Sequence, residues 1–282
     1  MPCAASVSFN QDLSLARAVN VRGTVNVIAA ARVQDKKGLL RRVDYVGTTY
    51  VAASLHGTLY EGELPKISVF HNTYERTKWE AEHVARQAQT DLPLTIFRPS
   101  IVVGDSKTGY TSNFRVLYWP LRVLASGLAV IVPADRAGIL DIVPSDFVTD
   151  AFDALTGDGA PTGGCYNLAA GPKSQSTFGE ILDMGIEFFG VRRPWVVPPA
   201  LFHKVLKSVS SIFLWGKRRD ALKRAEVYFP YFSIRANFDT SQAQKYLSQH
   251  GIGPPRVADY FRTLMTYCVH TNWGQIAPDR NA

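Results

Sequence analysis

Apolar residues along the first two-thirds of the chain fall alternately into short continuous runs and into longer stretches with helical spacing. The run at 94–103 (LTIFRPSIVV), cut by Pro99, is typical of a strand buried on both faces. The segment 73–89 predicts a helix, with Asn72 or Thr73 as its N-cap and glutamates in its first turns. The same criteria predict further strands at 3–9, 42–51, 140–143 and 165–169, and helices at 13–33, 146–155 and 177–189.

Continuous apolar strands separated by helices of about 12–20 residues predict an α/β fold, with a parallel sheet that helices cover on both faces. The predicted helix at 13–33 is rich in alanine and broken only at Gly23. The segment 194–199 (PWVVPP) is the best candidate for a domain boundary, because the chain beyond it is more helical and more basic. We therefore expect one domain at 1–193 and a smaller, mostly helical lobe at 194–282.

Composition narrows the class of protein. The chain has 282 residues, of which 46% are hydrophobic, and this suffices for a sizeable core. No apolar run is long enough to span a bilayer, and the first residues lack the layout of a signal peptide. The three cysteines match no metal spacing and suit a reducing compartment, so we expect a cytoplasmic protein without a metal site.

The formal net charge is +7, and basic residues are concentrated in 203–224. Nucleic acid is not expected as a partner, because no zinc, helix-turn-helix or RNP signature accompanies the charge. The segment 201–224 also carries apolar residues at helical spacing. It can be an ordinary amphipathic helix of the substrate lobe, a membrane-surface helix, or a lid whose basic residues meet coenzyme A phosphates.

The clearest candidate for a catalytic pair lies in 71–82 (HNTYERTKWEAE), where Tyr74 and Lys78 are four residues apart and share one helix face. A nearby ammonium lowers the pKa of a phenol from about 10. A phenol tuned in this way can exchange a proton with a carbonyl or alcohol oxygen. The spacing by itself is also what a solvated surface pair would show, so it needs support from other segments.

That support comes from 45–53 (YVGTTYVAA), which places Thr48 and Thr49 where a predicted strand ends. Ligands of parallel sheets bind beyond the carboxyl ends of the strands, so a threonine hydroxyl there can share a substrate oxygen with Tyr74. The alternative is that threonines are present only because they favour strands.

Together with other segments of the sequence, these residues make the chain resemble the extended short-chain dehydrogenase/reductase superfamily, most closely its fatty acyl-CoA reductase and thioester reductase branch. The similar segments run in the same order over about 170 residues, and their collinearity is more specific than any one of them. They are CAASVSF (3–9), NVRGTVNV (20–27), YVGTTYVAA (45–53), TYERTKWEAE (73–82), FRPSIVVGDSKTG (97–109), LDIVPSDFVTDA (140–151) and CYNLAAGP (165–172).

The resemblance implies a Rossmann-like doubly wound sheet and a catalytic role for three residues. Tyr74 would be the general acid/base, and Lys78 would lower its pKa and hydrogen-bond the nicotinamide ribose. Thr48 would orient the substrate carbonyl, with Thr49 as the fallback, because the usual Ser-Thr of the family reads Gly47-Thr48 here.

The resemblance also implies residues around the cofactor. Asn20 matches an asparagine on the preceding helix, although a role in helix packing explains it equally well. Asp141, Pro144 and Asp146 match a loop near the site, and as turn and N-cap residues they need no catalytic role. The positions expected to contact the dinucleotide are Ala4, Ala5, Lys78, Pro99, Ser100, Ile101 and Val102.

The glycine-rich strand-to-helix turn that holds a dinucleotide pyrophosphate is not found, because the sequence has no GxGxxG or GxxGxxG. The resemblance begins only at the fourth strand of the family, so we expect an N-terminally truncated chain. Such a chain would leave 3–9 as an apolar edge strand, open to aggregation or pairing, and would bind dinucleotide poorly.

The function expected from these features is NAD(P)H-dependent reduction of a carbonyl, with an acyl thioester as the favoured substrate. The dinucleotide would be NADP, or else NAD, and a homodimer and peripheral membrane contact through 201–224 are compatible with the sequence. A 3β-hydroxysteroid or flavonol-type dehydrogenase, or a nucleotide-sugar epimerase, would use the same three residues. An inactive fragment without the phosphate loop is the alternative outside enzymes.

Overall fold

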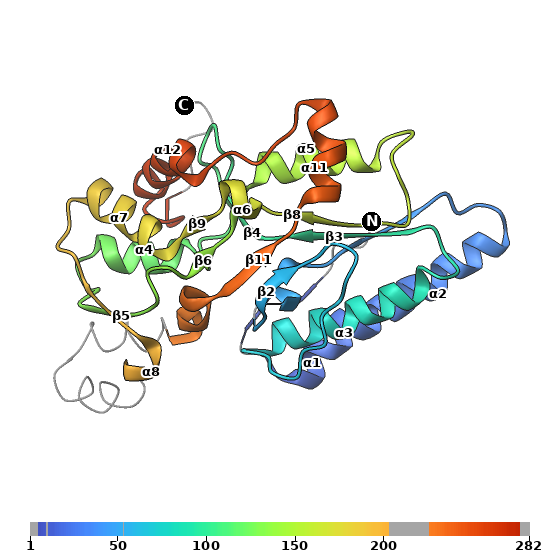
Figure 1. The fold of residues 1–282 in the computed structure, drawn as a ribbon, viewed down its shortest axis with the longest axis horizontal. Coiled ribbons are helices and arrows are strands. Elements are labelled where there is room, and N and C mark those ends of the chain that lie inside the picture. Colours follow the sequence, from blue (N-terminus) through green and yellow to red (C-terminus); the bar gives the residue numbers. More distant parts are fainter. Residues whose placement is uncertain (1–4, 10, 53, 203–225, 277–282) are drawn as a thin grey trace. The chain divides into compact units, whose positions relative to one another are not determined.

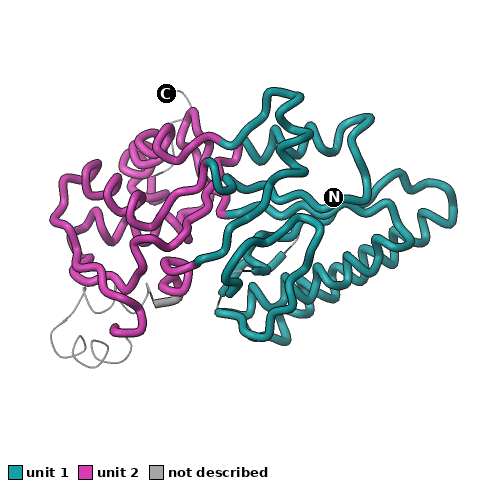
Figure 2. Tube along the Cα trace, viewed as in Figure 1, with its two compact units in different colours: residues 1–100, 147–173, 235–254 teal, residues 101–146, 174–234, 255–282 magenta. Residues whose placement is uncertain are grey.

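The structure is a computed structural model that describes residues 5–9, 11–52, 54–202 and 226–276 (Figure 1). The chain forms two compact units, each assembled from three separate stretches of sequence (Figure 2). Unit 1 comprises residues 1–100, 147–173 and 235–254, and unit 2 comprises 101–146, 174–234 and 255–282. The division expected at residue 193 stays a prediction about folding domains.

Unit 1 is built on parallel strands, as the sequence predicted. Its three-stranded sheet has the order β1 (Val43–Val46), β3 (Leu94–Pro99), β8 (Cys165–Leu168). Both pairings in this sheet are parallel, with Val43 opposite Leu94 and Ile96 opposite Cys165. A second parallel pair joins β2 (His56–Leu59) to β11 (Arg235–Phe238).

The helices of unit 1 begin and end close to where the sequence predicted them. Helix α3 starts after Asn72, whose side chain accepts a hydrogen bond from the Glu75 amide at 2.9 Å. The bounds are α1 (Leu13–Arg17), a π-helical segment (Ala18–Arg22), α2 (Gly23–Lys36), a 3-10 turn (Thr49–Ala52), α3 (Thr73–Ala88), α5 (Ser145–Thr156, in unit 1 from residue 147), α6 (Gly171–Ser174), α11 (Ser241–Leu247) and a 3-10 turn (Ser248–His250).

Side chains of alternate residues on β3 pack on opposite faces of the sheet, as the pleat of a strand requires. Ile96 belongs to a buried cluster with Ile28 of α2 and with Ala81 and Ala85 of α3. The small alanine side chains suit close packing of α3 against its neighbours, and α2 and α3 lie side by side (Figure 1). Phe97, the next residue, packs on α5 instead, with its ring 5.0 Å from that of Phe152.

The strand predicted at 3–9 is wrong for the residues that the structure describes, because 5–9 form no strand. The polar groups of Ser6 pair with a side chain instead. The Ser6 amide donates to Asn20 Oδ1 at 2.8 Å, and Asn20 Nδ2 donates to the Ser6 carbonyl at 3.1 Å. The Asn20 amide thus supplies the two bonds that a neighbouring strand would otherwise make.

The helix predicted at 13–33 runs to Lys36, but the predicted break at Gly23 is wrong. The irregularity lies one turn earlier, in the π-helical segment that contains Asn20. Gly23 has ordinary helical dihedrals, with φ of −55° and ψ of −48°, and begins α2. Single-turn π segments inside α-helices are frequent at functional sites.

Unit 2 contains short strand pairs and four α-helices among its described residues. The run predicted as one strand at 94–103 is divided at Ser100, and that predicted at 140–143 is divided at Asp141. The elements are β4 (Ile101–Val103) parallel to β7 (Ile142–Pro144), β5 (Ile131–Pro133) parallel to β10 (Trp195–Val197), β6 (Ile139–Leu140) antiparallel to β9 (Ser176–Thr177), α4 (Tyr118–Ala125), α7 (Phe178–Phe189), α8 (Pro199–Leu201), a 3-10 segment (Glu226–Ser233) and α12 (Val257–His270).

Two predictions concern membranes, and the structure tests only one of them. Within the part of the chain that the structure describes, every helix is too short or too polar to cross a bilayer. The amphipathic segment predicted at 201–224 lies outside the described residues from position 203 on, so its three alternatives stay predictions.

A buried ion pair connects α3 to β3. Arg98 at the end of β3 and Glu82 on α3 are both fully buried, and Arg98 Nε donates to Glu82 Oε2 at 2.9 Å, beside a second short bond from Nη2. Arg86 Nε also donates to Glu82, at 2.9 Å. Burial opposes the charge of Arg98, but the Glu82 carboxylate outweighs it, so the pKa of Arg98 is raised.

We expect the substitution Glu82→Gln to lower the free energy of unfolding by about 3–5 kcal/mol, because it leaves a buried guanidinium without its counter-charge. Urea unfolding followed by circular dichroism measures the change. Glu80→Gln is the matched control, because Glu80 lies on the same helix and pairs with the more exposed Arg17 and Arg76. The control should lose less than about 1 kcal/mol. Equal losses in the two variants would show that the buried pair stabilises the fold no more than the exposed one, which would contradict this prediction.

Candidate active site

The exit of β1 and the first turns of α3 bring the predicted catalytic residues together within unit 1. The ladder of β1 continues through Gly47, whose amide donates to the Phe97 carbonyl at 2.7 Å. Thr48 follows immediately and starts the turn at Thr49–Ala52, with its Oγ1 accepting from the Tyr50 amide at 3.2 Å. A hydrogen bond joins the side chain of Thr48 to the phenol of Tyr74.

Lys78 lies one helical turn beyond Tyr74 and is buried. Its Nζ donates to the carbonyl of Val46, the last residue of β1, at 2.8 Å. The same ammonium lies 5.3 Å from the centroid of the Tyr45 ring, within the range of a cation–π contact. The lysine is therefore held at the end of the strand that also presents Thr48.

A cavity reaches Tyr74 and Lys78. It offers about 270 Å³ to the centre of a water-sized sphere, which is room for a ligand group rather than for a single water. One side is the helical stretch that contains Val19, Gly23 and Val27, spaced four residues apart. Another side is the end of β1, and Ala5 lies on the wall.

Asn20 also lines this cavity, and its amide has a structural use. Besides its two bonds to Ser6, its Nδ2 donates to Thr77 Oγ1 of α3 at 2.9 Å. Phe9, in the same segment as Ser6, packs its ring 5.8 Å from the ring of Tyr74. Asn20 therefore ties the segment 5–9 and α3 to the π-helical turn, which accords with the packing role that the sequence left open.

The pKa of Tyr74 is raised above its usual value of 10, with burial of the phenol as the largest cause. The hydrogen bond with Thr48 acts in the opposite direction and lowers the pKa. The lowering that the sequence led us to expect from Lys78 is therefore not observed. With its pKa raised, the phenol is protonated at neutral pH, as a proton donor must be, but it is a weaker acid than an ordinary tyrosine.

The positions predicted to contact a dinucleotide fall into three groups. Ala5 and Lys78 border the cavity, whereas Ala4 lies outside the described residues. Pro99 and Ser100 lie at the carboxyl end of β3 in unit 1. Ile101 and Val102 belong to β4 in unit 2, where Ile101 lines a different, apolar pocket and Val102 is exposed.

The loop residues predicted near the site also belong to unit 2. Asp146 accepts hydrogen bonds from the amide and the hydroxyl of Ser106, at 2.9 and 2.6 Å, which is a structural use. Asp141 is buried and separates β6 from β7, and Pro144 ends β7.

Sequence reasoning missed two features of the site. Tyr45 supplies the ring beneath the Lys78 ammonium, and the period-2 alternation of 42–51 places it on the same strand face as Val43. The helix face formed by Val19, Gly23 and Val27 was also missed, although its four-residue spacing is visible in the sequence.

One buried hydroxyl on the cavity wall supports a ligand site. Among the described residues, Tyr45 Oη, which belongs to a residue lining the cavity, has no hydrogen-bond partner, and the same holds for Thr49 Oγ1 and Ser100 Oγ, whose residues do not line it. Buried polar groups are normally paired, so an unpaired hydroxyl calls for an explanation such as a bound ligand or water.

A parallel sheet with a strand-end threonine beside a helical Tyr-Lys pair is the arrangement expected from the resemblance to the extended short-chain dehydrogenase/reductase class. A model of the NAD-binding family described as "Male sterility protein" matches residues 1–152. The chain belongs to this family.

Individual proteins of known sequence or structure are similar as well. "Fatty acyl-CoA reductase wat" of Drosophila melanogaster is 28% identical over 218 residues, which cover 66% of this chain and 41% of that protein. The terminal R domain from the myxalamid PKS-NRPS biosynthetic pathway has the same fold, with a TM-score of 0.77 and 24% identity over 98% of this chain and 69% of that chain. UDP-glucuronic acid 4-epimerase from Bacillus cereus shares it too, with a TM-score of 0.67 and 16% identity over 96% of this chain and 73% of that one.

We expect the phenol of Tyr74 to titrate above pH 10, because burial disfavours its charged form. Replacing Thr48 by Val should raise this pKa further, since it removes the hydrogen bond that lowers it. NMR of protein carrying ¹³Cζ-labelled tyrosine measures both values, with the Tyr74 signal assigned by its loss in Tyr74→Phe.

The exposed Thr90 gives the control, because Thr90→Val removes a hydroxyl at the other end of α3 and should leave the titration unchanged. A Tyr74 midpoint below 10, or one that Thr48→Val does not move, would contradict this description of the site.

Proposed function

We propose that the protein is an NAD(P)H-dependent oxidoreductase that reduces the carbonyl of an acyl thioester, bound to coenzyme A or to a carrier, to an aldehyde or alcohol. The observation that carries the proposal is the hydrogen-bonded pair of Thr48 and Tyr74 beside the buried Lys78. Tyr74 and Lys78 border a cavity of about 270 Å³. A proton donor, an orienting hydroxyl and a fixed cation thus stand at the end of one parallel strand, where such sheets bind ligands.

Each of the three side chains has a separate task. Tyr74, which is protonated at neutral pH, donates a proton to the substrate oxygen. Thr48 shares the same oxygen by a hydrogen bond and so fixes the carbonyl. Lys78, anchored on the Val46 carbonyl, contributes positive charge beside the phenol and hydrogen bonds to the ribose of the dinucleotide.

The proposed reduction adds one hydride and one proton and releases one thiol. A thioester carbonyl that gains a hydride at carbon and a proton from Tyr74 at oxygen becomes a hemithioacetal, which expels a thiol and leaves an aldehyde. A second reduction of the same kind would give an alcohol. The relatives named as fatty acyl-CoA reductases support a thioester as the substrate.

The residues at the strand ends fit the nicotinamide end of a dinucleotide. The buried hydroxyl of Tyr45 has no hydrogen-bond partner among the described residues, and Tyr45 lines the cavity together with Ala5 and Lys78; Pro99 lies at the end of β3. When bound, the dinucleotide supplies the hydride. NADP is the dinucleotide that we favour, with NAD as the alternative, and Ile101 and Val102 stay predicted contacts.

The chain spans 41% of the length of the Drosophila reductase, so the activity of the chain as a whole is proposed. A homodimer and a membrane contact through 201–224 also stay proposals.

We expect Tyr74→Phe to lower kcat for acyl-CoA reduction by about 10²–10⁴-fold, because it removes the proton donor. The affinity for NADPH should stay close to that of the wild type, because the ring is retained. Loss of NADPH absorbance measures turnover, and titration calorimetry measures NADPH binding.

The exposed Tyr60 offers a matched control, since Tyr60→Phe removes a hydroxyl on the same unit and should leave turnover unchanged. Unaltered turnover in Tyr74→Phe would refute the role of Tyr74. NADPH oxidation with a steroid or nucleotide sugar but with no acyl-CoA of the panel would refute the thioester.

A further inference from the structure

A histidine and a buried carboxylate pair at the start of α3, next to the proposed proton donor. His71 Nδ1 lies 3.2 Å from Glu75 Oε2, and the backbone amide of His71 donates to the same oxygen at 2.9 Å. The Glu75 side chain is only 1% exposed, whereas that of His71 is 26% exposed. Because Glu75 follows Tyr74 directly in the chain, the pair adjoins a residue of the proposed reaction without being part of it.

Helix capping accounts for only part of this arrangement. Asn72 accepts a hydrogen bond from the Glu75 amide at 2.9 Å, and the Glu75 carboxylate reaches back to the amide of His71. This is the reciprocal pattern of a capping box, displaced by one residue. Capping needs only an oxygen at position 75, which a glutamine would supply as well. It does not use the imidazole of His71, whose contact with the carboxylate therefore calls for a second explanation.

The charges of the pair act on the phenol of Tyr74. Burial is the largest cause of the raised pKa of Tyr74, and the negative charge of Glu75 raises it further. A protonated His71 carries a positive charge that offsets the carboxylate, whereas a neutral His71 leaves the carboxylate uncompensated. The phenol is therefore a stronger acid when His71 is protonated than when it is neutral.

His71 changes its charge in the pH range in which this matters. The hydrogen bond with Glu75 raises the pKa of His71 above its usual value of 6.5, and the carboxylate charge acts in the same direction, while burial opposes both. Histidine is the side chain whose ordinary pKa allows it to switch near neutrality. The partial exposure of the ring lets it exchange protons with the solvent.

The other groups around Tyr74 differ from His71 in this respect. On the side of β1, Tyr45 is an electrostatic neighbour of the phenol, and Thr48 hydrogen-bonds to it. On α3, Lys78 borders the same cavity. Burial raises the pKa of Tyr45 well above 10. Of these groups, His71 is the one whose ordinary pKa lies near neutrality.

We propose that His71 and Glu75 are positioning residues for Tyr74, and that protonation of His71 makes Tyr74 a better proton donor. The assignment rests on the proposed reduction, in which Tyr74 protonates the substrate oxygen. At low pH the imidazolium neutralises Glu75, and the phenol releases its proton more readily. At high pH the uncompensated carboxylate disfavours the phenolate, so reduction is slower above the pKa of His71 than below it.

NMR titration of protein with ¹³Cζ-labelled tyrosine tests the pair without a substrate. Glu75→Gln keeps an oxygen for the cap but removes the charge, so the pKa of Tyr74 should fall by at least about half a unit. The pKa of His71, followed by its ring signals, should fall towards 6.5 in the same variant. Glu80→Gln is the matched control, because Glu80 lies on the same helix and pairs with Arg17, and it should change neither value.

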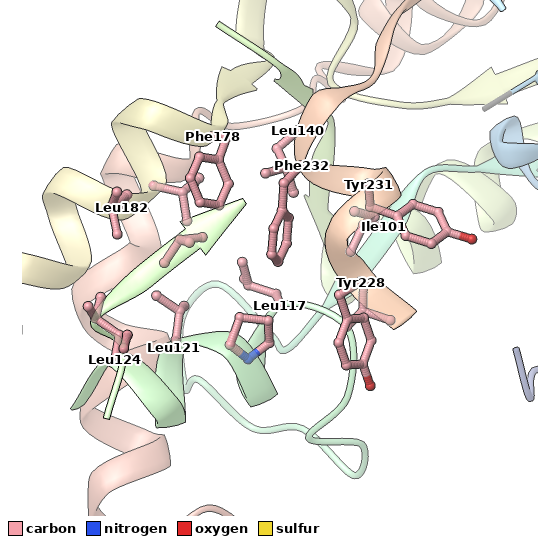
Figure 3. A pocket seen from close by; sticks show the side chains of 15 residues that line it. Ile101, Leu117, Leu121, Leu124, Leu140, Phe178, Leu182, Tyr228, Tyr231 and Phe232 are labelled. Carbon is pink, nitrogen blue, oxygen red and sulfur yellow. The ribbon is translucent and has the colours of Figure 1, made fainter. Parts of the chain in front are cut away.

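Tyr228 and Tyr231 give internal references in the same spectra. They line the apolar pocket of unit 2, which α4, α7 and the 3-10 segment 226–233 form and in which no lining side chain carries a charge (Figure 3). Their titration should be the same in all variants. A shift of their signals as large as that of Tyr74 would overturn the assignment, because it would reveal a change in the whole protein.

The pH profile of acyl-CoA reduction gives a second readout. In the wild type, kcat should fall about threefold as the pH rises through the pKa of His71, as expected when the pKa of a half-transferred proton changes by about one unit. His71→Gln should show the lower rate at every pH, because its carboxylate is never neutralised. Glu75→Gln should show at least the higher rate at every pH.

A Tyr74 pKa that Glu75→Gln leaves unchanged, or a fall in kcat that persists in His71→Gln, would overturn the role of the pair. The two proposals fail in different ways. If Tyr74 responds to Glu75→Gln but the protein reduces no acyl-CoA, the proposed function alone is refuted. If the protein reduces acyl-CoA but Tyr74 does not respond, the role of the pair alone is refuted.

Discussion

The ion pair between Arg98 and Glu82 joins α3 to β3 through charge-assisted hydrogen bonds. Both side chains are fully buried, so neither charge has water as an alternative partner. Glu82 lies four residues after Lys78 and eight after Tyr74, so all three positions follow one stripe of the helix. Fixing Glu82 against the end of β3 therefore fixes the height of Tyr74 and Lys78 along the sheet.

The same pair explains a glycine next to the site. A Cβ at Gly47 would lie 3.3 Å from Glu82 Oε2 and 3.5 Å from the Phe97 carbonyl, so a side chain there would crowd the ion pair. Glycine, which has no Cβ, leaves this space free. Thr48, the next residue, is buried and hydrogen-bonds to Tyr74.

Local patterns in the sequence predicted much of this architecture, because they report burial and capping directly. Helix α3, with Asn72 as one of two candidate caps, and a parallel sheet were predicted, and both are observed, with β1 paired to β3. The strand predicted at 3–9 was not, since its apolar residues gave no sign that the Asn20 side chain would occupy the backbone groups of Ser6. Contacts made by one side chain across 14 residues leave no periodic signal.

The candidate site, too, could be predicted from the sequence only in part. Tyr74, Lys78 and Thr48 were predicted from a family resemblance, but the raised pKa of Tyr74 depends on burial, which the sequence does not report. The apolar pocket of unit 2 combines α4, α7 and the 3-10 segment 226–233, whose proximity no local pattern encodes.

In the proposed reaction the dinucleotide would supply a hydride to the carbonyl carbon of a thioester while Tyr74 protonates the oxygen. Incubation of the protein with an acyl-CoA and NADPH deuterated at both C4 positions, followed by mass spectrometry of the products, tests this reaction. We expect an aldehyde that carries deuterium at its former carbonyl carbon, together with an equal amount of free coenzyme A thiol. An aldehyde without deuterium, or thiol release without consumption of NADPH, would contradict it.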